Sequence, residues 1–193
     1  MEKSPVISGC KVVIIGGSAG SLDVLLKVLP RLTLPTFAVV LVVHRKSSED
    51  STLEELIAIK TSIPVKEVED KIALLPGNIY IAPSDYHLLF EKNDQLSLDT
   101  SEKVNYSRPS IDVSFESAAD VYGPALVAVL LSGANADGTQ GLQAIKAAGG
   151  IVVVQDPETA EMPFMPRNAT ENVAADYILG INDLYEFISA INT

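Results

Sequence analysis

Cysteine, histidine and tryptophan are scarce or missing in this sequence, and acidic residues outnumber basic ones. The 193 residues include one cysteine, two histidines and no tryptophan, and 14 Lys and Arg against 25 Asp and Glu give a formal net charge of −11. The single cysteine, Cys10, excludes an intramolecular disulfide and a cysteine-cluster metal site. A strongly negative surface repels phosphate backbones, so we expect no nucleic-acid partner.

Long hydrophobic runs are also missing. The longest apolar stretch, residues 32–43, is interrupted by Thr33, Pro35 and Thr36, and it falls short of the roughly 18–20 residues that span a bilayer. The first apolar run, residues 12–15, is too short for the central segment of a signal peptide. We therefore expect a cytoplasmic protein without membrane insertion.

The rest of the composition is that of a globular protein, with 47% hydrophobic and 20% charged residues. No repeat, low-complexity segment or linker divides the chain. We expect residues 1–193 to form a single domain, with residues 1–10 as an N-terminal extension.

Short apolar runs alternate with helical patterns along most of the chain. The runs are rich in β-branched residues and unbroken, which is typical of strands buried on both faces. This alternation predicts an α/β fold with a doubly wound, mainly parallel sheet, a Rossmann-like three-layer sandwich. The clearest strands are expected at residues 12–15, 37–43, 125–131 and 151–154.

Two regions depart from this pattern. Residues 78–82, 87–90 and 96–98 are short apolar runs separated by turn signals, and we expect an antiparallel hairpin region there. Residues 155–166 are expected to form a long polar loop before a helix near residues 167–174.

Three reactive side chains directly follow expected strands. Ser18 follows the first strand, His44 the second, and Asp137 the strand at 125–131. Ligands of open α/β sheets bind beyond the carboxyl ends of the strands, so these side chains can share one edge of the sheet. A serine, a histidine and an aspartate are the nucleophile, base and orienting group of acyl hydrolysis.

The loop around Ser18 supports this hypothesis. Residues 16–20 read GGSAG and match the G-x-S-x-G turn that exposes a nucleophile between a strand and a helix. The N–H of Ala19 would then help to hold an oxyanion. Two alternatives stay open: a phosphate or nucleotide loop, and a plain turn. The dinucleotide pattern G-x-G-x-x-G is not met, because Ser18 occupies its second glycine position.

Each of the other two roles has an alternative interpretation. His44 and His87 are the two histidines, and either could be a hydrogen-bonded structural residue. Asp137 could be only the N-cap of the following helix. Asp156 is the second candidate for the orienting carboxylate, and Asp85, Asp112 and Asp120 are less well placed. Two distant histidines with scattered carboxylates do not predict a metal site.

Several separated stretches together resemble one family, over about residues 11–191. They are residues 15–20, 42–44, 75–83, 108–112, 131–133, 137–138, 141, 155–160 and 165–166. In their order and spacing the chain resembles the catalytic domain of the chemotaxis protein-glutamate methylesterase of the CheB type.

The resemblance implies a serine esterase that hydrolyses glutamate γ-methyl esters on the cytoplasmic helices of chemoreceptors and also deamidates glutamines. It implies that Ser18 is the nucleophile, His44 the general base and Asp137 its orienting group. It adds the backbone N–H of Ala134 as a second oxyanion donor and requires no cofactor. The family's best-known members carry an N-terminal receiver domain, so a stand-alone esterase or a receiver or methyltransferase protein acting in trans is expected here. The alternative is a non-catalytic signalling module of the same fold.

The chain departs from the family pattern at the edges of the expected site. Ser18-Ala19-Gly20-Ser21 stands where the family commonly has Ser-Thr-Gly-Gly, and Gly-Ala-Asn-Ala-Asp-Gly at 133–138 stands where Gly-Met-Gly-x-Asp-Gly is common. Arg45 and Lys46 replace a less charged continuation after His44. We expect these changes to affect substrate choice more than the three catalytic side chains.

Overall fold

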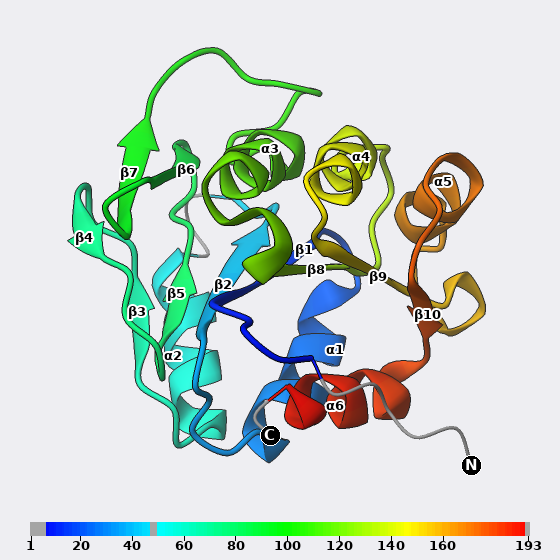
Figure 1. Cartoon of the computed structure of the whole chain (residues 1–193), viewed down its shortest axis with the longest axis horizontal. Helices are drawn as coiled ribbons and strands as arrows, with labels where there is room; N and C mark the ends of the chain where they lie inside the picture. The colour runs from blue at the N-terminus through cyan, green and yellow to red at the C-terminus, as the bar shows by residue number, and fades with distance from the viewer. Residues whose placement is uncertain (1–6, 47–49, 192–193) are drawn as a thin grey trace.

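The most apolar segments form a parallel sheet through the middle of the molecule (Figure 1). The structure, a computed structural model, describes residues 7–46 and 50–191. Within these residues the main sheet has seven strands in the order β10-β9-β8-β1-β2-β5-β3, and each neighbouring pair is parallel. The strands are β1 (Val12–Gly17), β2 (Ala38–Val43), β3 (Val65–Glu67), β5 (Ile79–Ile81), β8 (Leu126–Leu130), β9 (Ile151–Gln155) and β10 (Tyr177–Leu179).

Helices cover both faces of this sheet (Figure 1). On one face lie α3 (Ile111–Tyr122), α4 (Thr139–Ala147) and α5 (Phe164–Asn172). On the other lie α1 (Ser21–Val28), α2 (Asp50–Lys60) and α6 (Ile181–Ala190). The predicted doubly wound, Rossmann-like α/β sandwich is therefore confirmed. No helix in the described ranges is both long and apolar enough to cross a membrane.

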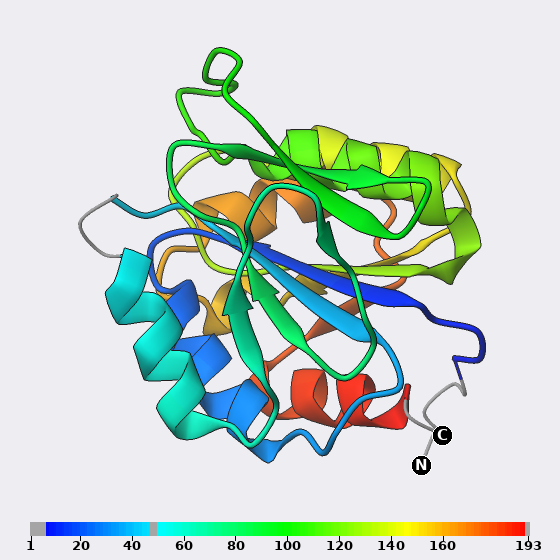
Figure 2. The same cartoon turned by 90° about the vertical axis from the view of Figure 1, so that its left-hand side faces the viewer.

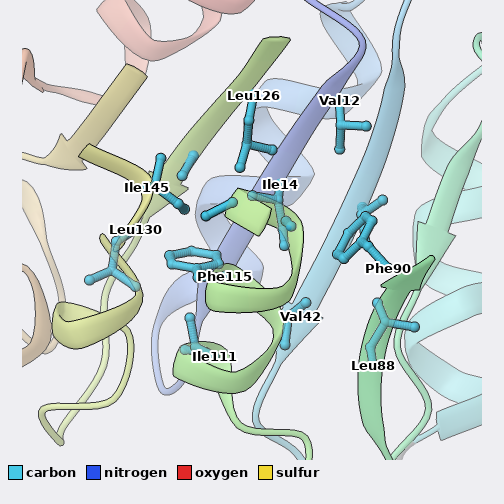
Figure 3. Packing of buried hydrophobic residues seen from close by; sticks show 14 of the residues in the cluster. Val12, Ile14, Val42, Leu88, Phe90, Ile111, Phe115, Leu126, Leu130 and Ile145 are labelled. Carbon is cyan, nitrogen blue, oxygen red and sulfur yellow. The ribbon is translucent and has the colours of Figure 1, made fainter. Parts of the chain in front are cut away.

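Alternation along the strands divides the interior into two cores. Val12 and Ile14 of β1 face α3 and α4, whereas Val13 and Ile15 face α1 and the other helices of the opposite layer. This is the two-residue period of a strand that is buried on both faces. Figure 3 shows the first core, where side chains of the sheet meet Phe115 of α3 and residues of α4 and β6.

A small antiparallel sheet lies beside the main one (Figure 2). Its strands come from the later part of the first half of the sequence. In the described chain it has the order β4-β7-β6, with β4 (Ile72–Ala73), β6 (His87–Glu91) and β7 (Gln95–Asp99). The hairpin predicted at 87–98 is confirmed by the antiparallel pairing of β6 and β7. The placement of residues 78–82 in the same antiparallel region was wrong. That segment is β5, which pairs in parallel with β2 and β3, because Ile79, Tyr80 and Ile81 are all buried and suit an interior strand.

The polar loop predicted at 155–166 is shorter than expected. A 3₁₀ turn occupies Pro157–Thr159, and α5 begins at Phe164 rather than near Arg167. Pro166 lies in the first turn of α5, where a missing backbone N–H costs little because that group has no helical acceptor. Helix α5 therefore begins two residues before Pro166, the residue at which the polar loop was expected to end.

Candidate active site

Ser18 and His44 leave neighbouring strands at the same edge of the sheet. The register of β1 and β2 pairs Gly17 with Val43, so Ser18 and His44 come directly after a paired position. The backbone N–H of His44 also donates to the carbonyl of Gly17 at 3.0 Å. Both side chains line an open cavity of about 370 Å³.

Glycines allow the sharp turn that presents Ser18. Gly20 has φ +82, and a Cβ at this position would lie 2.6 Å from the Oγ of Ser132. A Cβ on Gly17 would lie 2.6 Å from that of Ser21. The turn is also held by hydrogen bonds, since Ser18 donates its N–H to the carbonyl of Ser132 at 2.9 Å. A larger residue at Gly17 or Gly20 would displace the turn.

Asp137 fixes one nitrogen of the His44 ring. The Nε2 atom of His44 lies 2.7 Å from Oδ2 of Asp137. An ionised carboxylate only accepts hydrogen bonds, so Nε2 carries the proton and Nδ1 is left as the basic nitrogen. Among the hydrogen bonds of the described residues, none joins the Ser18 hydroxyl to His44. The two side chains share the cavity without a direct bond.

The carboxylate of Asp137 is fully buried at the N-terminus of α3. Within the described chain it accepts six hydrogen bonds. Its donors are Nε2 of His44, Nδ2 of Asn105, Oγ of Ser110, and the backbone N–H groups of Ile111, Asp112 and Gly138. Helix N-termini stabilise anions through their free N–H groups and dipole.

These donors decide the charge of Asp137. Burial alone would raise its pKa, but the hydrogen bonds from His44 and from the N–H groups of Asp112 and Ile111 lower the pKa to about 2. Asp137 therefore stays ionised at neutral pH and can stabilise a protonated His44. Asp137 is not the N-cap of the following helix, because α4 is preceded by Gly138 without a side-chain cap.

Three residues of this cluster were not identified from the sequence. Ser110 is the N-cap of α3 and also donates to Asp137, and Asn105 reaches Asp137 from the segment before α3. Asp112 was considered less well placed, yet its Oδ1 accepts from Gly138 and Gly141 at 3.0 and 2.7 Å. Burial raises the pKa of Asp112 to about 6, and the negative charge of Asp137 adds to this rise. In the sequence, residues 108–112 stand out only as part of the family resemblance.

The two residues predicted to supply oxyanion donors line different cavities. Ala19 lines the same cavity as Ser18, whereas Ala134 lines a second cavity with Met162 and Phe164. In the described part of the chain neither N–H has a hydrogen-bond acceptor. The Oγ of Ser132 donates to the carbonyl of Ala19 at 2.7 Å and holds that peptide.

Asn135, one of the departures from the family pattern, stabilises the loop before Asp137. Its Oδ1 accepts the N–H of Asp137 at 3.0 Å. This is the local side-chain to backbone bond that asparagine forms in tight turns. Arg45, another departure, lines the cavity and has its guanidinium 3.8 Å from a carboxylate oxygen of Glu67.

His87 and Asp156 lie outside the cavity around Ser18. His87 is 1% exposed, and its ring lies between the carbonyl of Glu102 at 2.8 Å and the N–H of Ser110 at 3.1 Å. Asp156 caps the turn at Pro157–Thr159 and accepts the N–H of Glu158. Over the described residues, no three His, Cys, Asp or Glu side chains are grouped so that they could hold a metal ion.

The arrangement can carry out acyl transfer. A serine on a sharp turn lies in one cavity with a histidine whose far nitrogen is held by a buried carboxylate. Leu22, Leu53 and Leu56 supply apolar walls to this cavity. The site therefore brings together the three side chains expected for a nucleophile, a base and an orienting anion, beside a cavity that can receive a small ester group.

Comparisons with known proteins agree with this chemistry. A sequence profile of the CheB methylesterase family matches residues 13–188. A Leptospira interrogans protein, provisionally named protein-glutamate methylesterase/protein-glutamine glutaminase, is 44% identical over 177 residues, which are 90% of this chain and 91% of that protein. A Thermotoga maritima protein-glutamate methylesterase/protein-glutamine glutaminase is 38% identical over 181 residues, and the match spans 52% of its length.

The fold agrees as well. The crystal structure of the Thermotoga maritima CheB methylesterase catalytic domain superposes with a TM-score of 0.89 at 34% sequence identity. The superposition covers 93% of this chain and 97% of that domain. The residues that the family profile matches, 13–188, include Ser18, His44 and Asp137.

Proposed function

Since the chain belongs to the CheB methylesterase family, we propose that it hydrolyses glutamate γ-methyl esters on chemoreceptors and deamidates receptor glutamines through Ser18, His44 and Asp137. The observation that carries the proposal is the His44 ring, which Asp137 holds at 2.7 Å inside the cavity that also contains Ser18. The names of the relatives support the two activities.

In this mechanism Ser18 Oγ attacks the ester carbonyl while Nδ1 of His44 takes the hydroxyl proton. The N–H groups of Ala19 and Ala134 stabilise the tetrahedral oxyanion. His44 then returns the proton to the departing methoxide, methanol leaves, and a glutamyl-Ser18 ester remains. Water attacks this ester with His44 as base, which releases the glutamate carboxylate and restores Ser18. With a glutamine side chain the same steps release ammonia in place of methanol.

Asp137 supplies the electrostatic part of this mechanism. His44 becomes positively charged in each half-reaction, and the ionised carboxylate of Asp137 lies directly against it. Because Asp137 is buried and held by α3, no solvent has to reorganise as that charge forms. The proposal needs no cofactor.

The proposal also covers partners and location. Residues 1–193 act as one catalytic unit in the cytoplasm, and the substrates are the cytoplasmic helices of chemoreceptors. A receiver or methyltransferase protein acting in trans is the proposed regulator. The methylesterase names of the relatives, and the open cavity at Ser18, support a substrate side chain presented by another protein.

The test is methanol release from methylated chemoreceptor membranes, with the wild type compared with Ser18→Ala. We expect the substitution to lower the rate by at least about 10³-fold, because removal of a triad nucleophile leaves only the contribution of the remaining site. A fluorophosphonate probe, which labels only activated serines, should label the wild type and not the variant. Methanol release by the Ser18→Ala protein at the wild-type rate would refute the proposal.

A further inference from the structure

Asn105 joins two buried carboxylates at the base of the proposed triad. Its Nδ2 donates to Oδ2 of Asp112 at 2.8 Å and to Oδ1 of Asp137 at 3.2 Å. Both partners are acceptors, so the amide must present its NH₂ group to them. One neutral side chain therefore serves two carboxylates that are 3% and 0% exposed.

We infer that Asn105 is a positioning residue for the triad, which holds Asp112 and Asp137 in one arrangement and ties the segment before α3 to the His44 ring. The inference rests on the proposed function. Asn105 does not contact the cavity around Ser18, so its effect on the reaction passes through Asp137.

Repulsion between the carboxylates is the reason that such a bridge matters. Asp112 and Asp137 are buried, and like charges in a poorly solvated site repel strongly. Asp137 has donors from α3 and from His44, whereas Oδ2 of Asp112 has Asn105 as its donor in the described chain. Without the amide, Oδ2 of Asp112 would lose the hydrogen-bond donor that it shares with Oδ1 of Asp137.

The remaining surroundings of Asp112 are neutral. A cavity of about 280 Å³ borders Asn105 and Asp112, and α4 and α5 line it with amide, hydroxyl and methyl groups. On its own helix Asp112 follows Ile111 and the capping Ser110. The charged and titratable groups that this cluster includes are thus Asp112 itself, Asp137 and, through Asp137, His44.

Asn105 lies on a segment that projects from the molecule. Figures 1 and 2 both show the connection between β7 and α3 extending beyond the layers. At its tip Val104 and Ser107 pair through two backbone hydrogen bonds, and Asn105 and Tyr106 between them have φ 52 and 61. This is the two-residue hairpin turn in which asparagine is favoured at the first position.

The rest of the segment is held in place at its ends. The ring of His87 donates to the carbonyl of Glu102, and the guanidinium of Arg108 donates to the carbonyls of Thr100 and Ser101 at 3.0 and 2.8 Å. The tip itself is bound to the body of the molecule by the Asn105 amide. Tyr106, its neighbour in the turn, is 99% exposed.

Substitutions can separate the role of Asn105 in the turn from its role as a donor to the carboxylates. Asn105→Gly keeps the left-handed turn, since glycine adopts positive φ without strain, but it removes the amide. Tyr106→Gly is the matched control, because it places glycine at the other turn position and leaves the amide in place. p-Nitrophenyl acetate is a suitable substrate, because it is too small to need the projecting segment for docking.

We expect Asn105→Gly to lower kcat/KM for p-nitrophenyl acetate about 10-fold, mainly through kcat, as for loss of a hydrogen bond to a charged group. The acid limb of its pH profile should move to higher pH, because Asp112 holds its proton more tightly when the amide no longer donates to its carboxylate. Tyr106→Gly should keep the wild-type rate and pH profile. Wild-type kcat and an unmoved acid limb in Asn105→Gly would overturn the inference.

Failure of the proposed function would be recognised separately. If the wild type hydrolyses no ester, the proton on Nε2 of His44 can still be followed by NMR in both variants. Asn105→Gly should change the chemical shift of that proton and Tyr106→Gly should not. An unchanged shift in Asn105→Gly would overturn the inference about Asn105 whatever the activity of the protein.

Discussion

Ser18 and His44 line an open cavity, whereas Asp137, which holds His44, is fully buried at the N-terminus of α3. The Ser18 hydroxyl has no hydrogen bond to His44 among the described residues, but the Asp137 carboxylate has six donors. The orientation of His44, the proposed base, is thus fixed before any substrate binds. Ser18, the proposed nucleophile, is left accessible, as an enzyme that acts on side chains of another protein requires.

The same contrast separates the two buried carboxylates. Asp137 has its pKa lowered to about 2, while burial raises the pKa of Asp112 to about 6. Both carboxylates accept a hydrogen bond from the Asn105 amide. The difference between their pKa values therefore comes from His44 and the N-terminus of α3, which both donate to Asp137. Two acids in one cluster thereby acquire different charge states in weakly acidic solution.

Substitution of Asp137, the proposed orienting group, should produce the largest effect. Asp137→Asn keeps the size of the side chain but removes the charge that stabilises a protonated His44. We expect kcat/KM for p-nitrophenyl acetate to fall about 10⁴-fold, as when a triad aspartate is replaced by asparagine and loses its charge. Circular dichroism would verify the fold.

Asp156→Asn is the matched control for this prediction. It makes the same chemical change at an aspartate that caps the turn at Pro157–Thr159, and we expect wild-type activity. If Asp137→Asn kept its rate within a factor of ten, the buried cluster would not be the orienting group of the reaction.

Asp112 and Asp137 should contribute to the pH dependence of the free energy of unfolding with opposite signs. The native state binds a proton at Asp112 near pH 6, before the unfolded chain does at its usual value of 3.8, so this group adds stability as the pH falls from 7 to 5. Asp137 has the opposite sign, since its pKa is below the usual value, and its contribution is lost only as the pH falls through about 2.

Asp112→Asn should remove the first of these contributions. Urea denaturation at pH 7 and pH 5 should show the wild type gaining about 1 kcal/mol relative to the variant at the lower pH. The comparison of two proteins cancels the general effect of protonating a chain with a net charge of −11. A constant difference between them at both pH values would show that Asp112 does not titrate in this range.

The contrast also explains what the sequence could predict. The β-branched run at 12–15 predicted β1, and the residues that follow β1 and β2 predicted that Ser18 and His44 meet, because parallel strands end at one edge of a sheet. The roles of these side chains remain predictions that the variants above test.

The buried cluster could not be predicted in the same way. Asp112 lies 25 residues before Asp137, and their meeting depends on how α3 packs against the loop before α4, for which no local pattern exists. Asn105 reads as an ordinary turn residue until the fold places its amide on both carboxylates. The error at residues 78–82 has a related cause, since a short apolar run does not reveal whether its partners are parallel or antiparallel.

Substitution in the wall of the open cavity should have the smallest effect, and it should change KM rather than kcat. Leu56 of α2 lines the cavity around Ser18 and is 36% exposed. Leu56→Ala removes apolar contact with a bound ester but changes no charge and no hydrogen bond, so KM should rise about threefold while kcat stays unchanged. Stability should change by less than about 0.5 kcal/mol.

Ile59→Ala is the matched control, on the same helix but outside the cavity and 79% exposed, and it should alter neither kcat nor KM. A fall in kcat for Leu56→Ala would mean that the cavity wall helps to position the reacting groups, and the division between a fixed base and a passive substrate pocket would then be wrong.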